Sequence, residues 1–144
     1  MNPAVRTAVL GFVAAVLAVL AAHQVMVLAL HLIGWVPNPP YSMRPNPWGV
    51  PLILNGMFWG GVWGVAFAFL AGKLPGDTWL KGLILGLAGP LLIGNWLLLP
   101  VIRGQAMFAG FVPMRMLVGA LILGAFGIGW AYIYKAMAGR VAAA

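Results

Sequence analysis

The chain has 144 residues, of which 64% are hydrophobic and 6% are charged, and its mean hydropathy is +1.04. A soluble domain is about 45–50% apolar and about 25% charged, so this composition excludes a water-soluble globule. Eight Lys or Arg stand against a single acid, Asp77, which gives a net charge of +7. The basic residues are scattered singly between apolar runs, which is typical of the flanks of membrane helices and not of a nucleic-acid-binding surface.

The residue types that are missing exclude several kinds of site. One carboxylate cannot supply a catalytic carboxylate pair or a hard-cation site. The absence of cysteine excludes disulfides, thiolate metal sites, iron–sulfur clusters and cysteine nucleophiles. The one serine, Ser42, has no acid near it in the sequence to orient a base. We therefore expect no catalytic residues, no metal site and no cofactor.

Four apolar segments are long enough to cross a bilayer, which takes roughly 20 residues per helix. We predict an all-α polytopic membrane protein, a single domain of four transmembrane helices over residues 7–35, 48–72, 79–101 and 114–134. The first segment contains a weak candidate for a signal-peptide cleavage site, the small residues Ala21-Ala22. Its apolar run extends well beyond the core of a cleavable signal peptide, which is only about 7–15 residues long, so we expect an uncleaved helix.

Proline and glycine mark the connections between these segments. Five prolines within residues 36–47 predict a stiff, extended loop. Residues 73–78 predict a tight turn with Asp77 or Thr78 as the N-cap of the third helix. Pro90 predicts a kink within that helix.

The distribution of basic residues favours a topology with both termini in the cytoplasm. The side of the termini holds Arg6, Lys73, Lys81, Lys135 and Arg140, and the side of the proline-rich loop holds Arg44, Arg103 and Arg115. On this topology Trp35 and Trp48 belong to the outer aromatic belt, and Trp79, Trp130 and Tyr134 belong to the inner one.

Glycine recurs at four-residue spacing in the second segment, at Gly56, Gly60 and Gly64. In lipid, helices associate by close packing over small residues. This glycine face is therefore expected to pack the bundle. A compatible interpretation is that it also binds a second copy of the chain or a partner in a membrane complex.

The second and fourth segments share a pattern. Val50-Pro51 stands before Gly56, Gly61 and Gly64, and Val112-Pro113 stands before Gly119, Gly124 and Gly127. One interpretation of this similarity is a duplicated helical hairpin with parallel repeats.

The polar side chains within the predicted spans all fall in the outer half of the membrane: His23, Gln24, His31, Asn55 and Asn95, with Arg115 at the start of the fourth span. The inner half carries no polar side chain before the level of Tyr132, which argues against a hydrophilic path through one protomer. Two interpretations stay open for the polar residues. They hydrogen-bond to one another and fix the helix register, or they line a ligand pocket beneath the proline-rich loop.

For the pocket, we expect His31, Asn55 and Asn95 to converge, because an unpaired amide in hydrocarbon costs a few kcal/mol. Met57, Phe58 and Trp59 would line it. Gln24 and His23 would lie below it, and Arg44, Arg103 or Arg115 would lie at its mouth. Such a site suits an amphipathic molecule with an anionic or carbonyl head.

The two histidines argue against haem within one protomer. His23 and His31 are about 12 Å apart along one helix at ~1.5 Å per residue, so they cannot bind the two faces of one haem. A haem shared between copies, or a copper(I) site that includes Met26, stays open.

The run Phe58-Trp59-Gly60-Gly61-Val62-Trp63-Gly64, preceded by His23-Gln24, Pro40-Tyr41 and Gly49-Val50-Pro51, resembles a family of small proteobacterial membrane proteins of uncharacterised activity. The resemblance covers most of the chain. It implies a four-span protein of the bacterial inner membrane, and it brings no catalytic residues.

We therefore expect a non-enzymatic inner-membrane protein, either an accessory subunit or a binder of a lipophilic ligand such as a quinone or a lipid in the outer-leaflet pocket. The alternatives are a small oligomeric transporter or channel, and a haem or copper redox protein. The expected partner is the lipid bilayer, and no nucleic acid is expected.

Overall fold

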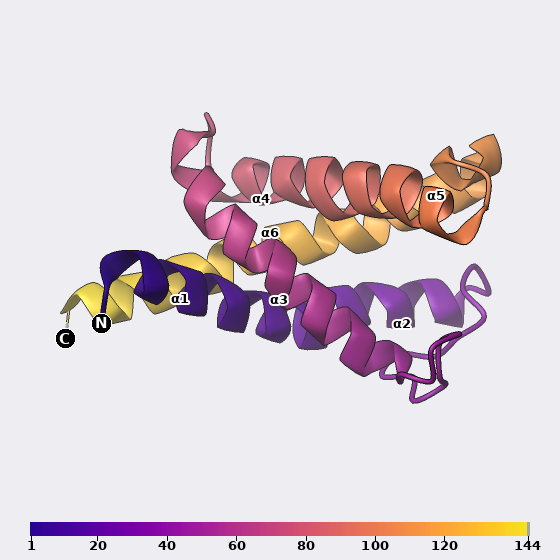
Figure 1. Cartoon of the computed structure of the whole chain (residues 1–144), viewed down its shortest axis with the longest axis horizontal. Helices are drawn as coiled ribbons and strands as arrows, with labels where there is room; N and C mark the ends of the chain where they lie inside the picture. The colour runs from indigo at the N-terminus through magenta and orange to yellow at the C-terminus, as the bar shows by residue number, and fades with distance from the viewer. Residues whose placement is uncertain (144) are drawn as a thin grey trace.

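The computed structural model describes residues 1–143 and, over that range, consists of helices and connecting loops without strands. Four helices are long and apolar enough to cross a membrane: Pro3–Leu32, Leu52–Lys73, Thr78–Arg103 and Pro113–Ala142. The prediction of an all-α bundle of four transmembrane helices is thus confirmed. Both termini lie at one end of the bundle, here called the terminal end (Figure 1). The opposite end, the loop end, carries the connections over residues 33–51 and 104–112.

Several elements build each long helix. The first consists of α1 (Pro3–Ala18), the π-helical η1 (Val19–His23) and α2 (Gln24–Leu32), and the second of α3 (Leu52–Leu70) and the 3-10 turn η2 (Ala71–Lys73). The third consists of α4 (Thr78–Gly86), the π-helical η3 (Leu87–Leu98) and α5 (Leu99–Arg103). The short 3-10 segment η4 (Phe108–Phe111) precedes the last helix, α6 (Pro113–Ala143).

The helix boundaries differ from the predicted ones where side chains or single residues set the ends. The first helix begins earlier, at Pro3, because the side chain of Asn2 accepts a hydrogen bond from the Ala4 N–H at 2.8 Å. It ends at Leu32, followed by Gly34 in the left-handed region with φ of 79°. The second helix begins at Leu52 rather than at residue 48, with Pro51 at its N-cap.

Two π-helical segments widen the first and third helices. Pro90 lies within η3, and because proline has no N–H it leaves a backbone carbonyl one turn earlier without its usual donor. The predicted kink is thus a stretch of altered helical pitch. The π-helical η1 contains no proline, and no residue pattern in the sequence had indicated it.

Glycines bring the two helices of each hairpin into backbone contact. A Cβ atom added at Gly64 of α3 would overlap the carbonyl oxygen of Gly11 and the Cβ of Ala15 in α1. In the same way, a Cβ atom at Gly127 of α6 would overlap the carbonyl oxygen of Gly82 and the backbone of Gly86 in α4. Only glycine permits such close approach, so each hairpin depends on it.

These contacts correspond residue by residue between the two hairpins. Gly11 also meets Ala68, four residues after Gly64, and Gly82 meets Ala131, four residues after Gly127. The contact positions of the first hairpin therefore recur in the second at the same spacing, with Gly86 in the place of Ala15. This geometry agrees with the interpretation of a duplicated helical hairpin.

The glycine face proposed for self-association is used inside the protomer. A Cβ atom at Gly56 or Gly60 would meet Val19, and one at Gly64 would meet Ala15 and Gly11. These three glycines therefore pack α3 against the first helix of the same chain. A second copy or a partner would have to bind another face.

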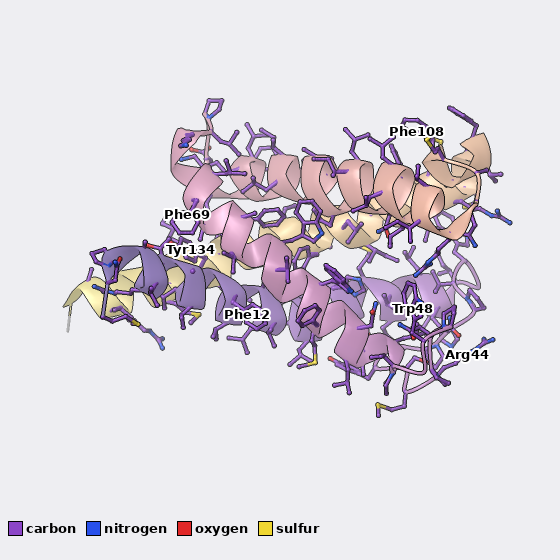
Figure 2. All side chains as sticks on the ribbon, viewed as in Figure 1. Phe12, Arg44, Trp48, Phe69, Phe108 and Tyr134 are labelled. Atoms are coloured by element: carbon purple, nitrogen blue, oxygen red, sulfur yellow. The ribbon has the colours of Figure 1, made fainter. Side chains whose placement is uncertain are left out.

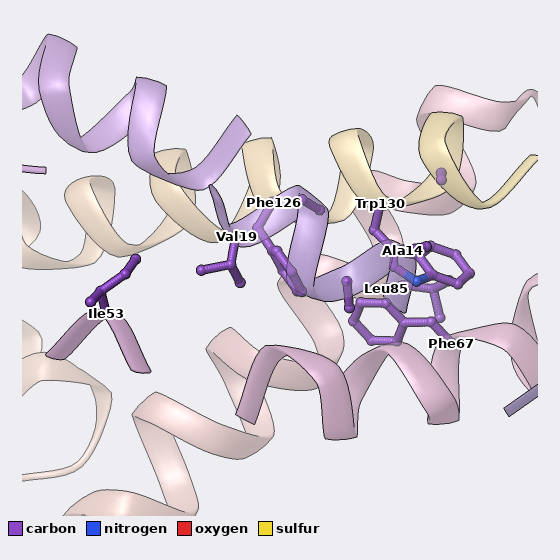
Figure 3. Close-up of a cluster of buried hydrophobic side chains, with 10 residues drawn as sticks. Ala14, Val19, Ile53, Phe67, Leu85, Phe126 and Trp130 are labelled. Atoms are coloured by element: carbon purple, nitrogen blue, oxygen red, sulfur yellow. The ribbon is translucent and has the colours of Figure 1, made fainter. Parts of the chain in front are cut away.

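Aromatic side chains join the hairpins. Phe67 of α3 and Phe126 and Trp130 of α6 are each 1% exposed, and they pack together with small and aliphatic residues in the core (Figure 3). The ring of Phe67 lies edge-on to that of Trp130 at 5.2 Å. The indole Nε1 of Trp130 donates to the carbonyl oxygen of Gly11 at 3.1 Å. The assignment of Trp130 to the inner aromatic belt was therefore wrong, because its one polar atom has a partner within the core.

The matched glycine contacts predict matched losses of stability. Gly64→Ala and Gly127→Ala should each lower the free energy of unfolding by about 1–3 kcal/mol, because the added methyl forces two backbones apart. Gly56→Ala is the control, since its nearest neighbour, Val19 Cγ1, is 3.7 Å from the added atom. Reversible unfolding in mixed micelles with increasing denaturing detergent measures all three. Equal stability of the Gly64 and Gly56 variants would contradict the packing described.

Candidate functional site

The long loop at the loop end is organised by the side chain of Asn46. Its Oδ1 accepts hydrogen bonds from the N–H groups of Trp48 at 2.9 Å and Val50 at 3.0 Å. Its Nδ2 donates to Oδ1 of Asn55, in the first turn of α3, at 3.3 Å. Asn46 therefore holds residues 46–50 in a turn. This turn explains why the helix predicted from residue 48 begins only after Pro51.

An open groove of about 430 Å³ lies between this turn and the exposed face of α3. It is lined by Asn46, Trp48, Val50, Leu54, Asn55, Phe58 and Trp59. Leu54 and Phe58, like Asn55 and Trp59, are four residues apart and so lie on one side of the helix. The rings of Phe58 and Trp59 meet edge-on at 5.2 Å. The groove thus combines large exposed aromatic surfaces with two amides.

A cation lies beside the groove. The guanidinium of Arg103, at the end of α5, is 5.1 Å from the centroid of the Trp48 ring, which is within cation–π distance. Trp48 belongs to the loop of the first hairpin and Arg103 to the second, so this contact connects the hairpins at the loop end. Figure 2 shows Trp48 at that end.

The charge of Arg103 has no acidic partner. The single acid of the chain, Asp77, precedes α4 at the terminal end. The cations of the loop end, Arg44, Arg103 and Arg115, are therefore not neutralised by a side chain of this protein. Asn55, which lines the groove, accepts a hydrogen bond through Oδ1, so its NH₂ group is not used in this pair.

The expected convergence of His31, Asn55 and Asn95 was wrong as a hydrogen-bonded cluster. His31 Nδ1 donates to the carbonyl oxygen of Val36 at 2.9 Å, and Asn55 pairs with Asn46 at 3.3 Å. Asn95 is exposed, and none of the side-chain hydrogen bonds within residues 1–143 reaches it. His31 and Asn55 find their partners in the long loop, because this loop folds back on its own helices and places backbone and amide groups near them.

The remaining predicted residues have separate surroundings. Gln24 Nε2 donates to His23 Nδ1 at 3.1 Å, and Gln24 Oε1 accepts from the Tyr41 N–H at 2.7 Å. Arg115 is exposed. Of the six predicted site residues, Asn55 lines the groove. Within residues 1–143, no three or more His, Cys, Asp or Glu side chains gather as a metal site would require.

Sequence reasoning missed Asn46 and the role of Trp48 in the groove. A signal for Asn46 was present, since an asparagine between two prolines and just before a Trp-Gly pair is typical of a side-chain-capped turn. Trp48 had been assigned to the aromatic belt, and its contact with Arg103 depends on how the hairpins meet, which no local pattern reveals.

Comparisons of the chain with known protein families, with curated proteins and with solved structures found no match. The function is therefore argued from the groove and its surroundings.

Asn46→Ala should destabilise the loop end, because it removes the acceptor for two backbone N–H groups and the partner of Asn55. We expect the free energy of unfolding to fall by about 1–3 kcal/mol. Asn38→Ala is the matched control, since Asn38 belongs to the same loop and does not bond to Trp48, Val50 or Asn55. Unfolding in mixed micelles, together with proteolysis of the loop, measures the difference. A loop equally resistant in both variants would contradict the organising role of Asn46.

Proposed function

We propose that the protein is a non-catalytic integral membrane protein that binds an anionic amphipathic lipid in the groove of Asn55, Trp48 and Trp59. The observation that carries the proposal is the Arg103 guanidinium, held against Trp48 without any acid at that end of the protein. An anionic head group would neutralise this charge, and the acyl chain would follow the apolar wall formed by Leu54 and Phe58.

The charge of Arg103 and the amide of Asn55 favour such a ligand over a purely apolar one. A free cation at a membrane interface attracts phosphate, and a charged hydrogen bond contributes about 1.5–3 kcal/mol. The NH₂ group of Asn55 adds a neutral donor within the same groove. Aromatic rings provide broad apolar contact at little cost in side-chain entropy, and Phe58 and Trp59 are both more than half exposed.

We further propose that the protein lies in a bacterial inner membrane with both termini in the cytoplasm, which puts the groove in the outer leaflet. The larger number of Lys and Arg at the terminal end supports this orientation. A four-helix topology with both termini at one end is consistent with it (Figure 1).

Lipid binding is tested with short-chain phosphatidylglycerol and phosphatidylcholine of the same chain length, titrated into the protein in detergent micelles. Tryptophan fluorescence reports binding, because Trp48 and Trp59 line the groove. We expect tighter binding of the anionic lipid, and about a tenfold loss in Asn55→Leu and in Arg103→Gln. Arg44→Gln is the control, since it removes the same charge from the same end without altering the groove.

Equal affinity for the two lipids would refute the anionic head group. A loss in Arg44→Gln as large as that in Arg103→Gln would show a general effect of charge and would refute the site.

The orientation is tested separately with reporter fusions. A reporter active only in the cytoplasm should be active when fused after residue 144 and inactive when inserted near Asn38, and a periplasm-specific reporter should give the opposite result. The reverse pattern would place the groove in the inner leaflet.

A further inference from the structure

The last helix is longer than the hydrocarbon layer of a membrane. It has 31 residues, which is about 46 Å at ~1.5 Å per residue, whereas the hydrocarbon layer is about 30 Å thick. Its exposed cations Arg115 and Lys135 are 20 positions apart, so the helix rises by about 30 Å between them. With Arg115 at one boundary of the hydrocarbon, Lys135 lies at the other. The last turns of α6, at the terminal end, therefore lie at the level of the lipid head groups (Figure 1).

An open hollow of about 630 Å³ lies on this part of α6. It is lined by Tyr132, Lys135, Ala136, Gly139 and Arg140. At ~100° per residue, Tyr132, Ala136 and Gly139 form one stripe along the helix, with Lys135 on one side of it and Arg140 on the other. A Cβ atom added at Gly139 would have no atom within 4 Å. The hollow therefore has a floor of small residues between two cations.

The surroundings of the hollow are positively charged. The terminal end carries five basic residues and the single acid of the chain, Asp77. The ammonium of Lys135 donates to Oγ1 of Thr78 at 3.4 Å, which keeps this charge on the α4 side of the hollow. Tyr132 is 52% exposed and lies on the hydrocarbon side of the two cations. Tyrosine at this level is typical of a membrane interface.

We propose that this hollow binds the phosphate of an anionic phospholipid between Lys135 and Arg140. A guanidinium can donate two parallel hydrogen bonds to phosphate oxygens, and an ammonium adds a compact positive charge. The ring of Tyr132 would contact the start of the acyl chains. A lipid suits the hollow better than a soluble phosphate, because the two cations lie where lipid phosphates are concentrated and an apolar ring lies on their hydrocarbon side.

This site is separate from the groove of Trp48 and Trp59. The groove lies at the loop end and the hollow at the terminal end, on opposite boundaries of the membrane, and no residue lines both. Neither site requires the other to bind a lipid.

The test counts lipid molecules bound to the full-length protein in detergent by native mass spectrometry. The probes are short-chain phosphatidylglycerol and phosphatidylcholine of the same chain length. The Arg103→Gln variant serves as the background, since it lacks the cation beside the groove and the bound lipid then reports the hollow. We expect one phosphatidylglycerol to bind, and phosphatidylcholine to bind about tenfold more weakly.

Two sets of variants distinguish a built site from a general effect of charge. Lys135→Gln and Arg140→Gln should each weaken phosphatidylglycerol binding about tenfold, since each removes a charged hydrogen bond. Lys73→Gln is their control, because it removes the same charge from the same end outside the hollow. Gly139→Trp should abolish binding by filling the hollow while both charges remain. Gly72→Trp is its control, since a Cβ atom added at either glycine would have no atom within 4 Å.

Three results would overturn the site: equal binding of the two lipids, full binding to Gly139→Trp, or a loss in Lys73→Gln as large as that in Arg140→Gln. Displacement of the lipid by an equal concentration of glycerol 3-phosphate would show that a soluble phosphate is the ligand, and it would overturn the assignment to a lipid.

Discussion

The backbone contact between Gly64 and Gly11, repeated between Gly127 and Gly82, is the constraint on which the rest of the structure depends. In water, apolar helices are driven together by the release of their hydration, but in lipid this driving force is absent. Close approach of two backbones then supplies the attraction, through dense dispersion contacts. Since each hairpin brings its own pair of glycines, each can form its main contact without the other.

The contact between hairpins is of a different kind. Phe67 on α3 corresponds to Trp130 on α6, and these two rings meet in the core. Phe67 also contacts Trp63 on its own helix and Phe126 on α6. The Trp63 ring also lies against Gly89 of η3, where a side chain would not fit easily. At the loop end, the hairpins are connected by the cation–π contact of Arg103 with Trp48. The buried aromatic core and the exposed groove therefore lie at different levels of the same bundle.

Much of this fold follows from the sequence, because hydropathy over about 20 residues is a strong local signal. The number of helices, the glycine faces and the similarity between residues 50–64 and 112–127 were all visible there. The π-helical η1 was not, since nothing local distinguishes Val19–His23 from an ordinary helix. Helix α3 begins later than predicted, because the side chain of Asn46 accepts hydrogen bonds from the N–H groups of Trp48 and Val50 and so holds this segment in a turn.

The site was harder to predict, for a physical reason. Polar groups at one depth on different helices were expected to pair with one another, but His31, Asn55 and Gln24 each pair with a group of the long loop. A loop that is folded back supplies partners at a small cost in chain entropy, because it is already tethered to both helices.

This tethering also explains the difference between the two hairpins. The connection over residues 33–51 is long enough to bring Tyr41 to Gln24 and Asn46 to Asn55, whereas the shorter connection over residues 104–112 packs the apolar ring of Phe108 on Trp96. The two hairpins therefore share their glycine packing, while the long loop pairs with the amides Gln24 and Asn55 of the first hairpin and Asn95 of the second hairpin is exposed.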